Sequence, residues 1–315
     1  MAAPPSDLDV VVLAGGVGGS KLVRGLAAEV DRDHLTIIVN TADDFEHLGL
    51  WISPDVDTVV HRLAGVHDPD HGWGRANDTW RVMDAVEALG GPDWFRLGDT
   101  DLATSLVRTH RRRQGASLSA ITRDIAMALG VEQRVLPMTD DVVATVVHTD
   151  EGELGFQEWF VARRCAPTVR GLEFRGAADA TTSEGLTTTI AAADVVVLAP
   201  SNPFLSIDPI LAVPAIGAAI AARRPHLPTI AISPIVGGRA LKGPAAALLS
   251  QFELPVSATG VARHLAPAIS AIVVAPEDLV EVAGVERVES TSMVMDDEAS
   301  ERALARDVLA AAHVA

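Results

Sequence analysis

The sequence predicts an α/β fold, in which a Rossmann-like, doubly wound and mostly parallel sheet carries a helical insertion and a small antiparallel addition. Short apolar, β-branched runs recur along the chain, and such runs are typical of buried parallel strands. Segments with helical periodicity separate most of these runs, which indicates crossover helices. A glycine-rich turn directly follows the first run. We therefore expect residues 1–315 to form a single α/β domain, with the helical insertion at about residues 65–135.

The first βαβ unit is expected to run from the apolar strand Val10–Leu13 to the second strand Leu35–Asn40. Between these strands, a helical pattern begins at Lys21–Leu26. The segment after the second strand is rich in carboxylates and is predicted to be irregular. It ends where Asp55 or Asp57 is expected to cap the next helix.

Helical periodicity dominates the middle third of the chain, so the insertion is predicted to be a cluster of helices. These helices are expected at Thr79–Leu89, Asp101–Arg113 and Leu118–Leu129, and Ser117 and Ser119 are candidate caps for the third.

Apolar or alternating runs follow the insertion and predict the antiparallel addition. They lie at Val142–His148, Gly155–Ala162 and Val169–Phe174. The α/β alternation then resumes. Strands are expected at Val195–Leu198, Thr229–Ile232 and Ile269–Val274, and helices at Ile210–Ala222 and Glu298–Ala312.

Composition limits the class of protein. The chain has 25 Lys and Arg against 42 Asp and Glu, a formal net charge of -17, so we expect it to bind neither nucleic acid nor a membrane. Cys165 is the single cysteine, which excludes an internal disulfide and indicates a reducing cytosol. The first residues lack the basic region of a signal peptide, and the longest apolar stretch, Leu211–Ala222, is broken by Pro214. We therefore expect a cytoplasmic protein.

The loop between the first strand and the first helix is rich in glycine and contains Gly15, Gly16, Gly18, Gly19 and Lys21. A strand, a glycine turn and a helix in this order bring backbone N–H groups to a helix N-terminus, where an anionic phosphate binds. The loop is not a dinucleotide fingerprint, because the third glycine would fall on Lys21. It is not a P-loop, because Ser20 stands where that pattern requires glycine and Leu22 stands where it requires serine or threonine. A glycine turn that binds no ligand is the alternative interpretation.

Polar residues also follow the other predicted strands, at the sheet edge where doubly wound folds bind ligands. After the second strand come the carboxylates Asp43, Asp44, Asp55 and Asp57. Their oxygens suit a hard divalent cation, although helix capping and solvation would also explain them. After later strands come two polar loops, Ser201-Asn202-Pro203 and a loop with Gly237, Gly238, Arg239, Lys242 and Gly243. Two anion-binding loops and one carboxylate cluster favour a diphosphate, a divalent metal and transfer at phosphorus.

Arg96 follows a short strand-like run, where it would either pair with Asp99 or reach into the pocket. Trp51, Trp73 and Trp80 lie in the same part of a chain with few aromatic residues. They would either stack on a flat aromatic ligand or form the core of the insertion. The histidines of this part, His47, His61, His67 and His71, show no metal-ligand spacing, so a structural or surface role is expected for each.

The chain resembles the 2-phospho-lactate transferase family of deazaflavin coenzyme (coenzyme F-420) biosynthesis, from about Leu13 to Pro244. The resemblance is carried, in order, by the segments GGVGGSKL, VNTADDFEHLGLWISPDVDTVVHRLAG, DPDHGWGRANDTW, WFRLGDTDLAT, LPMTDD, FQEWFV, LAPSNPFLSI and ISPIVGGRALKGP. The DPDHGWG segment and the DTW that follows it are most similar to the actinobacterial branch. The GGVGG loop departs from the GGTG-type loop of many relatives and lacks its threonine hydroxyl.

The resemblance implies a reaction in which a guanosine diphospho-linked three-carbon acid, phospholactate or phosphoenolpyruvate, is the donor. The terminal ribityl hydroxyl of the deazaflavin riboside Fo attacks the distal phosphorus, and GMP leaves with the help of Mg²⁺ or Mn²⁺. The family also implies a homodimer. Neither the choice between lactyl and enolpyruvyl donors nor the oligomeric state can be assigned to residues of the sequence.

The resemblance also implies residue roles. Asp57 and Arg96 match Fo-binding positions, with Trp51 beside them, and Asp43, Asp44 and Asp57 are the metal-ligand or base candidates. The nucleotide would be held by the glycine loop (Gly15, Gly16, Gly18, Gly19, Lys21), by Ser201, Asn202 and Pro203, and by Gly237, Gly238, Arg239 and Lys242. The alternatives are a regulatory protein that binds nucleotide-sugars without turnover and a nicotinamide-dependent dehydrogenase. Regulatory proteins of the first kind lack the PDVDT and WFRLGD segments. A dehydrogenase would need the dinucleotide fingerprint, whose third glycine is replaced here by Lys21.

Overall fold

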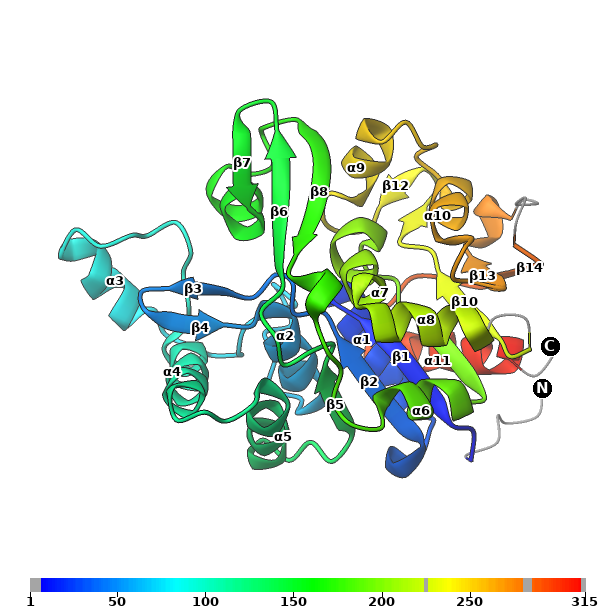
Figure 1. The fold of residues 1–315 in the computed structure, drawn as a ribbon, viewed down its shortest axis with the longest axis horizontal. Helices are drawn as coiled ribbons and strands as arrows, with labels where there is room; N and C mark the ends of the chain where they lie inside the picture. The colour runs from blue at the N-terminus through cyan, green and yellow to red at the C-terminus, as the bar shows by residue number, and fades with distance from the viewer. Residues whose placement is uncertain (1–6, 224–225, 280–284, 313–315) are drawn as a thin grey trace.

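A computed structural model of the chain describes residues 7–223, 226–279 and 285–312. Its centre is a seven-stranded parallel sheet with the order β14-β13-β10-β9-β1-β2-β5 (Figure 1). The strands are β1 (Val10–Ala14), β2 (Leu35–Val39), β5 (Arg134–Pro137), β9 (Val195–Leu198), β10 (Thr229–Ile232), β13 (Ala271–Val274) and β14 (Arg287–Ser290). The predicted doubly wound α/β class is confirmed. Strands β5 and β14, at the two edges of the sheet, were not expected from the sequence.

Both faces of the sheet are covered by helices, so side chains alternate between two apolar cores. Val10 and Val12 of β1 pack toward α1 (Gly16–Ala27), α2 (Pro54–Leu63) and α11 (Glu298–Ala312). Val11 and Leu13 pack toward the opposite face, which is covered by α6 (Leu186–Ala192) and α8 (Pro214–Arg223). Figure 1 shows α6 and α8 in front of the sheet and α1 and α11 behind it. Burial on both faces explains why β1 reads as a continuous apolar run.

The strand order reverses between β1 and β9. From β1 the chain adds β2 and β5 on one side, whereas β9, β10, β13 and β14 build the other side. The loops that leave neighbouring strands β1 and β9 therefore separate at their carboxyl ends, and this opening is the usual ligand site of a doubly wound sheet. The β1 loop is the glycine loop, and the β9 loop contains Ser201 and Asn202.

The insertion contains α3 (Arg81–Ala88), α4 (Asp99–Arg113) and α5 (Leu118–Ala128), as predicted. Ser117 caps α5 by accepting a hydrogen bond from the N–H of Ala120, whereas Ser119 lies inside the helix. The segment expected to be irregular forms a hairpin of β3 (Phe45–His47) and β4 (Leu50–Ile52) instead. These strands are too short for periodicity to reveal them. Figure 1 shows this hairpin and α3 extending away from the sheet; the division into one domain and an insertion stays a prediction.

A separate antiparallel sheet has the order β7-β6-β8, with β6 (Ala144–Thr149), β7 (Gly152–Gly155) and β8 (Val169–Arg175). The strand predicted at Gly155–Ala162 is wrong, because Glu158–Ala162 is a π-helical turn. Phe156, Trp159 and Phe160 have helical spacing, and Trp159 is 1% exposed with its indole N–H donating to the carbonyl of Pro167 at 3.0 Å. The apolar run was therefore assigned the wrong period.

Proline breaks the helix predicted at Ile210–Ala222 into α7 (Asp208–Ala212) and α8, which begins at Pro214. In the described residues no single helix has the length and apolar character to cross a membrane. The bent pair Pro203–Ala212 and Pro214–Arg223 meets the criterion jointly, with a 94° angle between its halves. The helices α9 (Ala245–Gln251) and α10 (Ala258–Leu265) were not predicted.

Candidate active site

A cavity of about 810 Å³ opens where the loops after β1 and β9 separate. Its lining also includes the start of α2, loops of the insertion and the chain around residues 241–245 and 293–296. The predicted site residues that line it are Gly15, Gly16, Gly18, Lys21, Asp43, Asp57, Arg96, Ser201, Asn202 and Lys242. Those that lie outside its lining are Gly19, Asp44, Trp51, Pro203, Gly237, Gly238 and Arg239. The sequence therefore predicted which loops form the cavity, but several of the residues predicted on these loops do not line it.

Helix α1 begins at Gly16, five residues before the start expected at Lys21, so most of the glycine loop lies within the first turns of the helix. Gly16 has a φ of +63°, a conformation that favours glycine. A Cβ on Gly18 would lie 2.5 Å from the carbonyl oxygen of Pro200, and one on Gly19 would lie 2.4 Å from Ser201 Oγ. These glycines therefore let α1 pack closely against the β9 loop, in addition to leaving space for a ligand.

The β9 loop is tied to the glycine loop. Ser201 Oγ accepts a hydrogen bond from the N–H of Gly15 at 3.1 Å and donates one to its carbonyl at 2.8 Å. Asn202 Oδ1 accepts from the N–H groups of Phe204 and Leu205 and so caps the next turn. Asn202 Nδ2 is buried and has no hydrogen-bond partner among the described residues. Ser201 thus positions the loop, and Asn202 has a free donor group at the cavity lining.

Two buried carboxylates, Asp43 and Asp55, line the cavity. Burial, followed by the charge of Asp55, raises the pKa of Asp43 well above its usual range. Burial also raises the pKa of Asp55 to about 6, although its carboxylate accepts hydrogen bonds from Asn40 Nδ2 at 3.0 Å and from the N–H of Gly16 at 2.8 Å. Asp55 therefore lies at the N-terminus of α1 as an internal anion. A divalent cation beside these two carboxylates would offset their repulsion.

A hydrogen bond joins the side chains of Asp44 and Trp51 at the base of the β3–β4 hairpin. Asp44 Oδ2 accepts hydrogen bonds from Ser53 Oγ at 2.6 Å and from Trp51 Nε1 at 3.1 Å, and burial raises the pKa of Asp44 to about 7. The Trp51 ring lies 4.1 Å from the guanidinium carbon of Arg112. Both side chains thus join local structural contacts. Among the described residues, three metal-ligand atoms come within 4.8 Å of one another only at His148, Glu153 and Glu173, so Asp43, Asp44 and Asp57 are not gathered into such a set.

Asp57 lies in the first turn of α2, whose N-cap residue is Ser53, so the capping role expected for Asp55 or Asp57 is not found. Arg108 Nη2 donates to Asp57 Oδ1, and Arg108 Nη1 donates to the carbonyl of Trp51 at 3.4 Å. Arg108 is 1% exposed, so this ion pair is largely shielded from solvent. Arg108 was not predicted as a site residue, because it belongs to a basic stretch of a distant helix, where the sequence does not distinguish a buried arginine from its more exposed neighbours.

A second pair of side chains joins α2 to α4. His61 Nδ1 lies 3.6 Å from Asp101 Oδ1, and both residues line the cavity. Burial lowers the pKa of His61 and, followed by the charges of Asp57 and Asp78, raises the pKa of Asp101 to about 7. Both shifts favour the uncharged forms. A structural or surface role was expected for His61, and its position in the cavity wall was not predicted.

Aromatic side chains from the insertion complete this part of the cavity. Trp94 and Phe95 line it with ring centroids 5.7 Å apart, and Trp73 also lines it, whereas Trp80 does not. Arg96 reaches the lining but does not pair with Asp99. Its guanidinium pairs instead with two carboxylates of α3, Asp84 and Glu87, and lies 5.8 Å from the Trp80 ring centroid.

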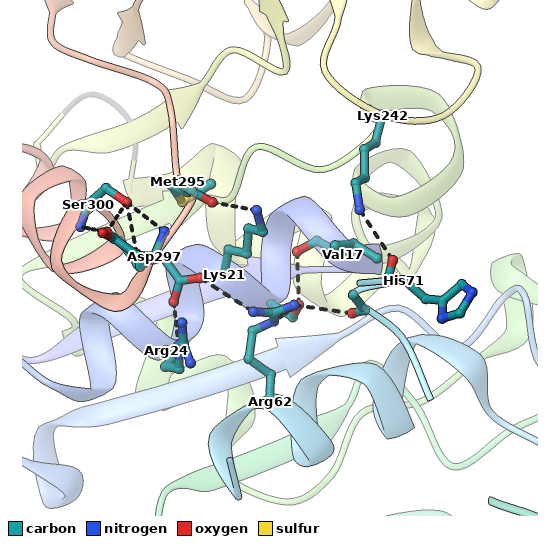
Figure 2. Close-up of polar contacts among 12 residues, drawn as sticks. Val17, Lys21, Arg24, Arg62, His71, Lys242, Met295, Asp297 and Ser300 are labelled. Carbon is teal, nitrogen blue, oxygen red and sulfur yellow. Dashed lines mark hydrogen bonds and ion pairs between the residues drawn. The ribbon is translucent and has the colours of Figure 1, made fainter. Parts of the chain in front are cut away.

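Cationic side chains surround the start of α1 (Figure 2). Lys21 Nζ donates to the carbonyl of Met295, and Lys242 Nζ donates to the carbonyl of His71 at 3.2 Å, so both ammonium groups are held by neutral acceptors. Beneath them, Arg62 is 3% exposed and donates to Ser20 Oγ at 2.9 Å and to Glu301 Oε1 at 3.4 Å. Burial, followed by the charge of Arg62, lowers the pKa of Lys21. This concentration of positive charge beside a helix N-terminus suits an anion.

The second predicted anion loop contributes only part of its residues. Gly237 and Gly238 form the turn of a hairpin between β11 (Ile235–Val236) and β12 (Arg239–Ala240), with φ values of +55° and +74°. The N–H of Gly237 donates to Asp278 Oδ2 at 2.8 Å. Arg239 is exposed outside the cavity, whereas Lys242 and Gly243 line it. The two glycines therefore allow the β11–β12 turn, and Lys242 is the residue of this loop that brings a positive charge to the cavity.

Comparison with known proteins identifies relatives along nearly the whole chain. A family model described as 2-phospho-L-lactate transferase CofD matches residues 10–313. A phosphoenolpyruvate transferase of Streptomyces griseus is 38% identical over 311 residues, which cover 95% of this chain and 97% of that protein. A 2-phospho-L-lactate transferase of Methanopyrus kandleri is 38% identical over 308 residues, which cover 96% and 97%. A solved UPF0052-family protein from Bacillus halodurans shares the fold, with a TM-score of 0.63 over 95% of this chain and 98% of that one at 17% identity.

Proposed function

This chain belongs to the 2-phospho-L-lactate transferase family and is a transferase of phospholactate or phosphoenolpyruvate groups, and we propose the following donor and acceptor for it. The donor is a guanosine diphospho-linked phospholactate or phosphoenolpyruvate, and the acceptor is the terminal ribityl hydroxyl of the deazaflavin Fo. The products are GMP and the coenzyme F-420 precursor that carries the transferred group.

The observation that carries this proposal is that the lining of one cavity combines cationic, acidic and aromatic side chains. Lys21 and Lys242 concentrate positive charge beside the start of α1, which suits the diphosphate of the donor. Asp57, with Trp94 and Phe95, lines the part that suits a planar acceptor with a hydroxylated chain. The cavity volume of about 810 Å³ lies within the roughly 300–1,000 Å³ that is typical of small-molecule sites.

In the proposed step, the ribityl oxygen forms a bond to the phosphorus that bears the three-carbon acid. The bond from this phosphorus to the oxygen bridging to GMP breaks, and that oxygen leaves with GMP. Asp57 receives the hydroxyl proton, because it faces the cavity from the rigid first turn of α2. Arg108 holds the Asp57 carboxylate through one oxygen and so fixes its orientation. The two lysines offset the charge that develops on the phosphate oxygens.

A divalent cation, Mg²⁺ or Mn²⁺, fits the residues present. Asp43 and Asp55 are buried carboxylates that repel each other at the cavity lining, and oxygen ligands of this kind suit Mg²⁺. These two residues would hold the ion, with Asp57 lining the same cavity, whereas Asp44 is bonded to Ser53 and Trp51. When bound, the ion would neutralise negative charge on the diphosphate.

Mass spectrometry of the product formed from each donor tests the proposal. Incubation with Fo and either donor should give GMP and a product whose mass identifies a lactyl or an enolpyruvyl group, which differ by two hydrogens. Guanine nucleotide binding without product from either donor would contradict the proposal and favour a regulatory binding protein. We further propose a cytoplasmic homodimer, and sedimentation of the purified protein would test the dimer.

A further inference from the structure

His61 and Asp101 bring unused hydrogen-bonding groups to the cavity wall. His61 is 1% exposed, and its Nδ1 and Nε2 atoms have no hydrogen-bond partner among the described residues. The same is true of Asp101 Oδ1, which lies 3.6 Å from His61 Nδ1. A buried polar atom without a partner costs about 1–3 kcal/mol, so native proteins rarely keep several together unless water or a ligand satisfies them.

The placement of this pair follows from helix geometry. His61 lies one turn after Asp57 on α2, so both side chains lie on the same face of the helix. The facing helix α4 contributes Asp101 opposite His61 and Arg108 opposite Asp57. The His61–Asp101 pair therefore extends the wall that holds the proposed base, and it does so from two rigid helices rather than from a loop.

The charges around the pair are balanced. The charged side chains that act on both His61 and Asp101 are the carboxylates Asp57 and Asp78 and the guanidinium groups Arg75 and Arg108. A neutral imidazole offers one donor and one acceptor, and a protonated carboxyl offers the same combination. An ionised phosphate offers acceptors only, and the lysines beside α1 match it better.

We propose that His61 and Asp101 form a hydrogen-bonding subsite that holds an uncharged hydroxyl or imide group of the acceptor and so positions its reacting hydroxyl. This assignment rests on the proposed function, because the acceptor Fo is part of that proposal. A ribityl hydroxyl and the imide edge of the deazaflavin ring both have the required donors and acceptors.

Fluorescence titration of the full-length protein with Fo, and separately with GDP, tests the subsite. His61→Phe and Asp101→Leu should weaken Fo binding roughly tenfold, the scale of a hydrogen bond lost at a buried site, and change GDP binding less than about twofold. Asp101→Asn keeps a donor and an acceptor and should bind Fo within about threefold of wild type. His61→Gln should behave in the same way, and Asp101→Leu still tests the loss of binding if His61→Phe does not fold.

A matched control is available in the same chain. His264 Nε2 and Asp208 Oδ2 form a His–Asp pair 2.7 Å apart that lies outside the cavity lining. His264→Phe should change neither affinity, and thermal melts of all variants report folding separately from binding.

A deazaflavin ring without the ribityl chain distinguishes the two possible ligand groups. If His61→Phe also weakens binding of this ring, the pair holds the imide edge; if only binding of Fo is weakened, the pair holds a ribityl hydroxyl. Wild-type Fo affinity in His61→Phe and Asp101→Leu, or an equal loss of GDP binding in these two variants, would overturn the subsite. Wild-type protein that binds no Fo would instead contradict the proposed function.

Discussion

The two parts of the cavity lining differ in how their charges are compensated. In the part that we call the lysine wall, Lys21 and Lys242 donate hydrogen bonds to backbone carbonyls and form no ion pair with a carboxylate among the described residues. In the part that we call the helix wall, Asp57 is paired with Arg108, and His61 and Asp101 are surrounded by balanced charges. A wall with unmatched charge attracts a counter-ion, whereas a balanced wall selects uncharged groups by hydrogen bonding. The proposed donor and the proposed acceptor differ in charge in the same way.

Removing divalent cations should give the largest effect, because it leaves the Asp43 and Asp55 carboxylates and the donor diphosphate without a counter-charge. Turnover after thorough EDTA treatment is expected to fall at least roughly a hundredfold, since metal neutralisation of phosphoryl oxygens contributes several kcal/mol. Addition of Mg²⁺ should restore it. Full turnover in EDTA would show that the lysine wall alone neutralises the diphosphate.

Asp57→Asn should give the next largest effect and tests the helix wall. The amide keeps the size of the side chain but does not accept the hydroxyl proton, so turnover is expected to fall roughly a hundredfold, the scale of lost general-base catalysis. Asp44→Asn is the matched control, because Asp44 lies outside the cavity lining, and it should keep turnover near that of wild type. Near-normal turnover of Asp57→Asn would assign the base role to another carboxylate.

Lys242→Ala addresses the lysine wall and should have a smaller effect. Loss of one charged hydrogen bond is expected to weaken GDP binding roughly tenfold while leaving Fo affinity unchanged. Arg239→Ala removes an exposed charge outside the cavity and should change neither affinity beyond about twofold. Calorimetric titration with each ligand gives both values. Equal losses of GDP and Fo binding in Lys242→Ala would mean that the two walls do not act separately.

The lysine wall could be largely predicted from the sequence, because its residues lie on segments that leave two strands of the sheet. Lys21 is in the first turns of α1, which follows β1, and Lys242 is on the segment that follows β10 and the β11–β12 hairpin, so the fold class alone places them at one edge of the sheet. The helix wall could not be predicted in this way. Arg108 and Asp101 reach it only through the packing of α4 on α2, and nothing in their local sequence indicates which helix face is buried.

Local structure also limited the prediction of single residues. Asp44 differs from Asp43 by one position, yet it turns to Ser53 and Trp51 instead of the cavity. Gly237 and Gly238 resemble an anion loop but satisfy the positive φ of a hairpin turn. Residue type and spacing therefore identify the right loops, whereas the direction of each side chain depends on tertiary contacts.

Arg96→Ala should have the smallest effect, and it tests whether Arg96 contacts the acceptor next to the helix wall. Arg96 lines the cavity, but its side chain is 32% exposed and pairs with Asp84 and Glu87 on α3. Surface ion pairs of this kind contribute little to stability, so we expect a change of only a few degrees in Tm and roughly threefold weaker Fo binding, with GDP binding unchanged. Fluorescence and thermal melts measure these changes.

The double variant Asp84→Asn with Glu87→Gln separates the two explanations of such a loss. It leaves the guanidinium in place but removes both of its carboxylate partners. If Arg96 contacts the acceptor, the freed guanidinium should bind Fo at least as well as in wild type. If Arg96 only holds α3 in position, the double variant should weaken Fo binding as much as Arg96→Ala does. In that case the arginine would act through α3 and not on the ligand, and the aromatic residues Trp94 and Phe95 would be the nearest acceptor contacts in this stretch of the cavity lining.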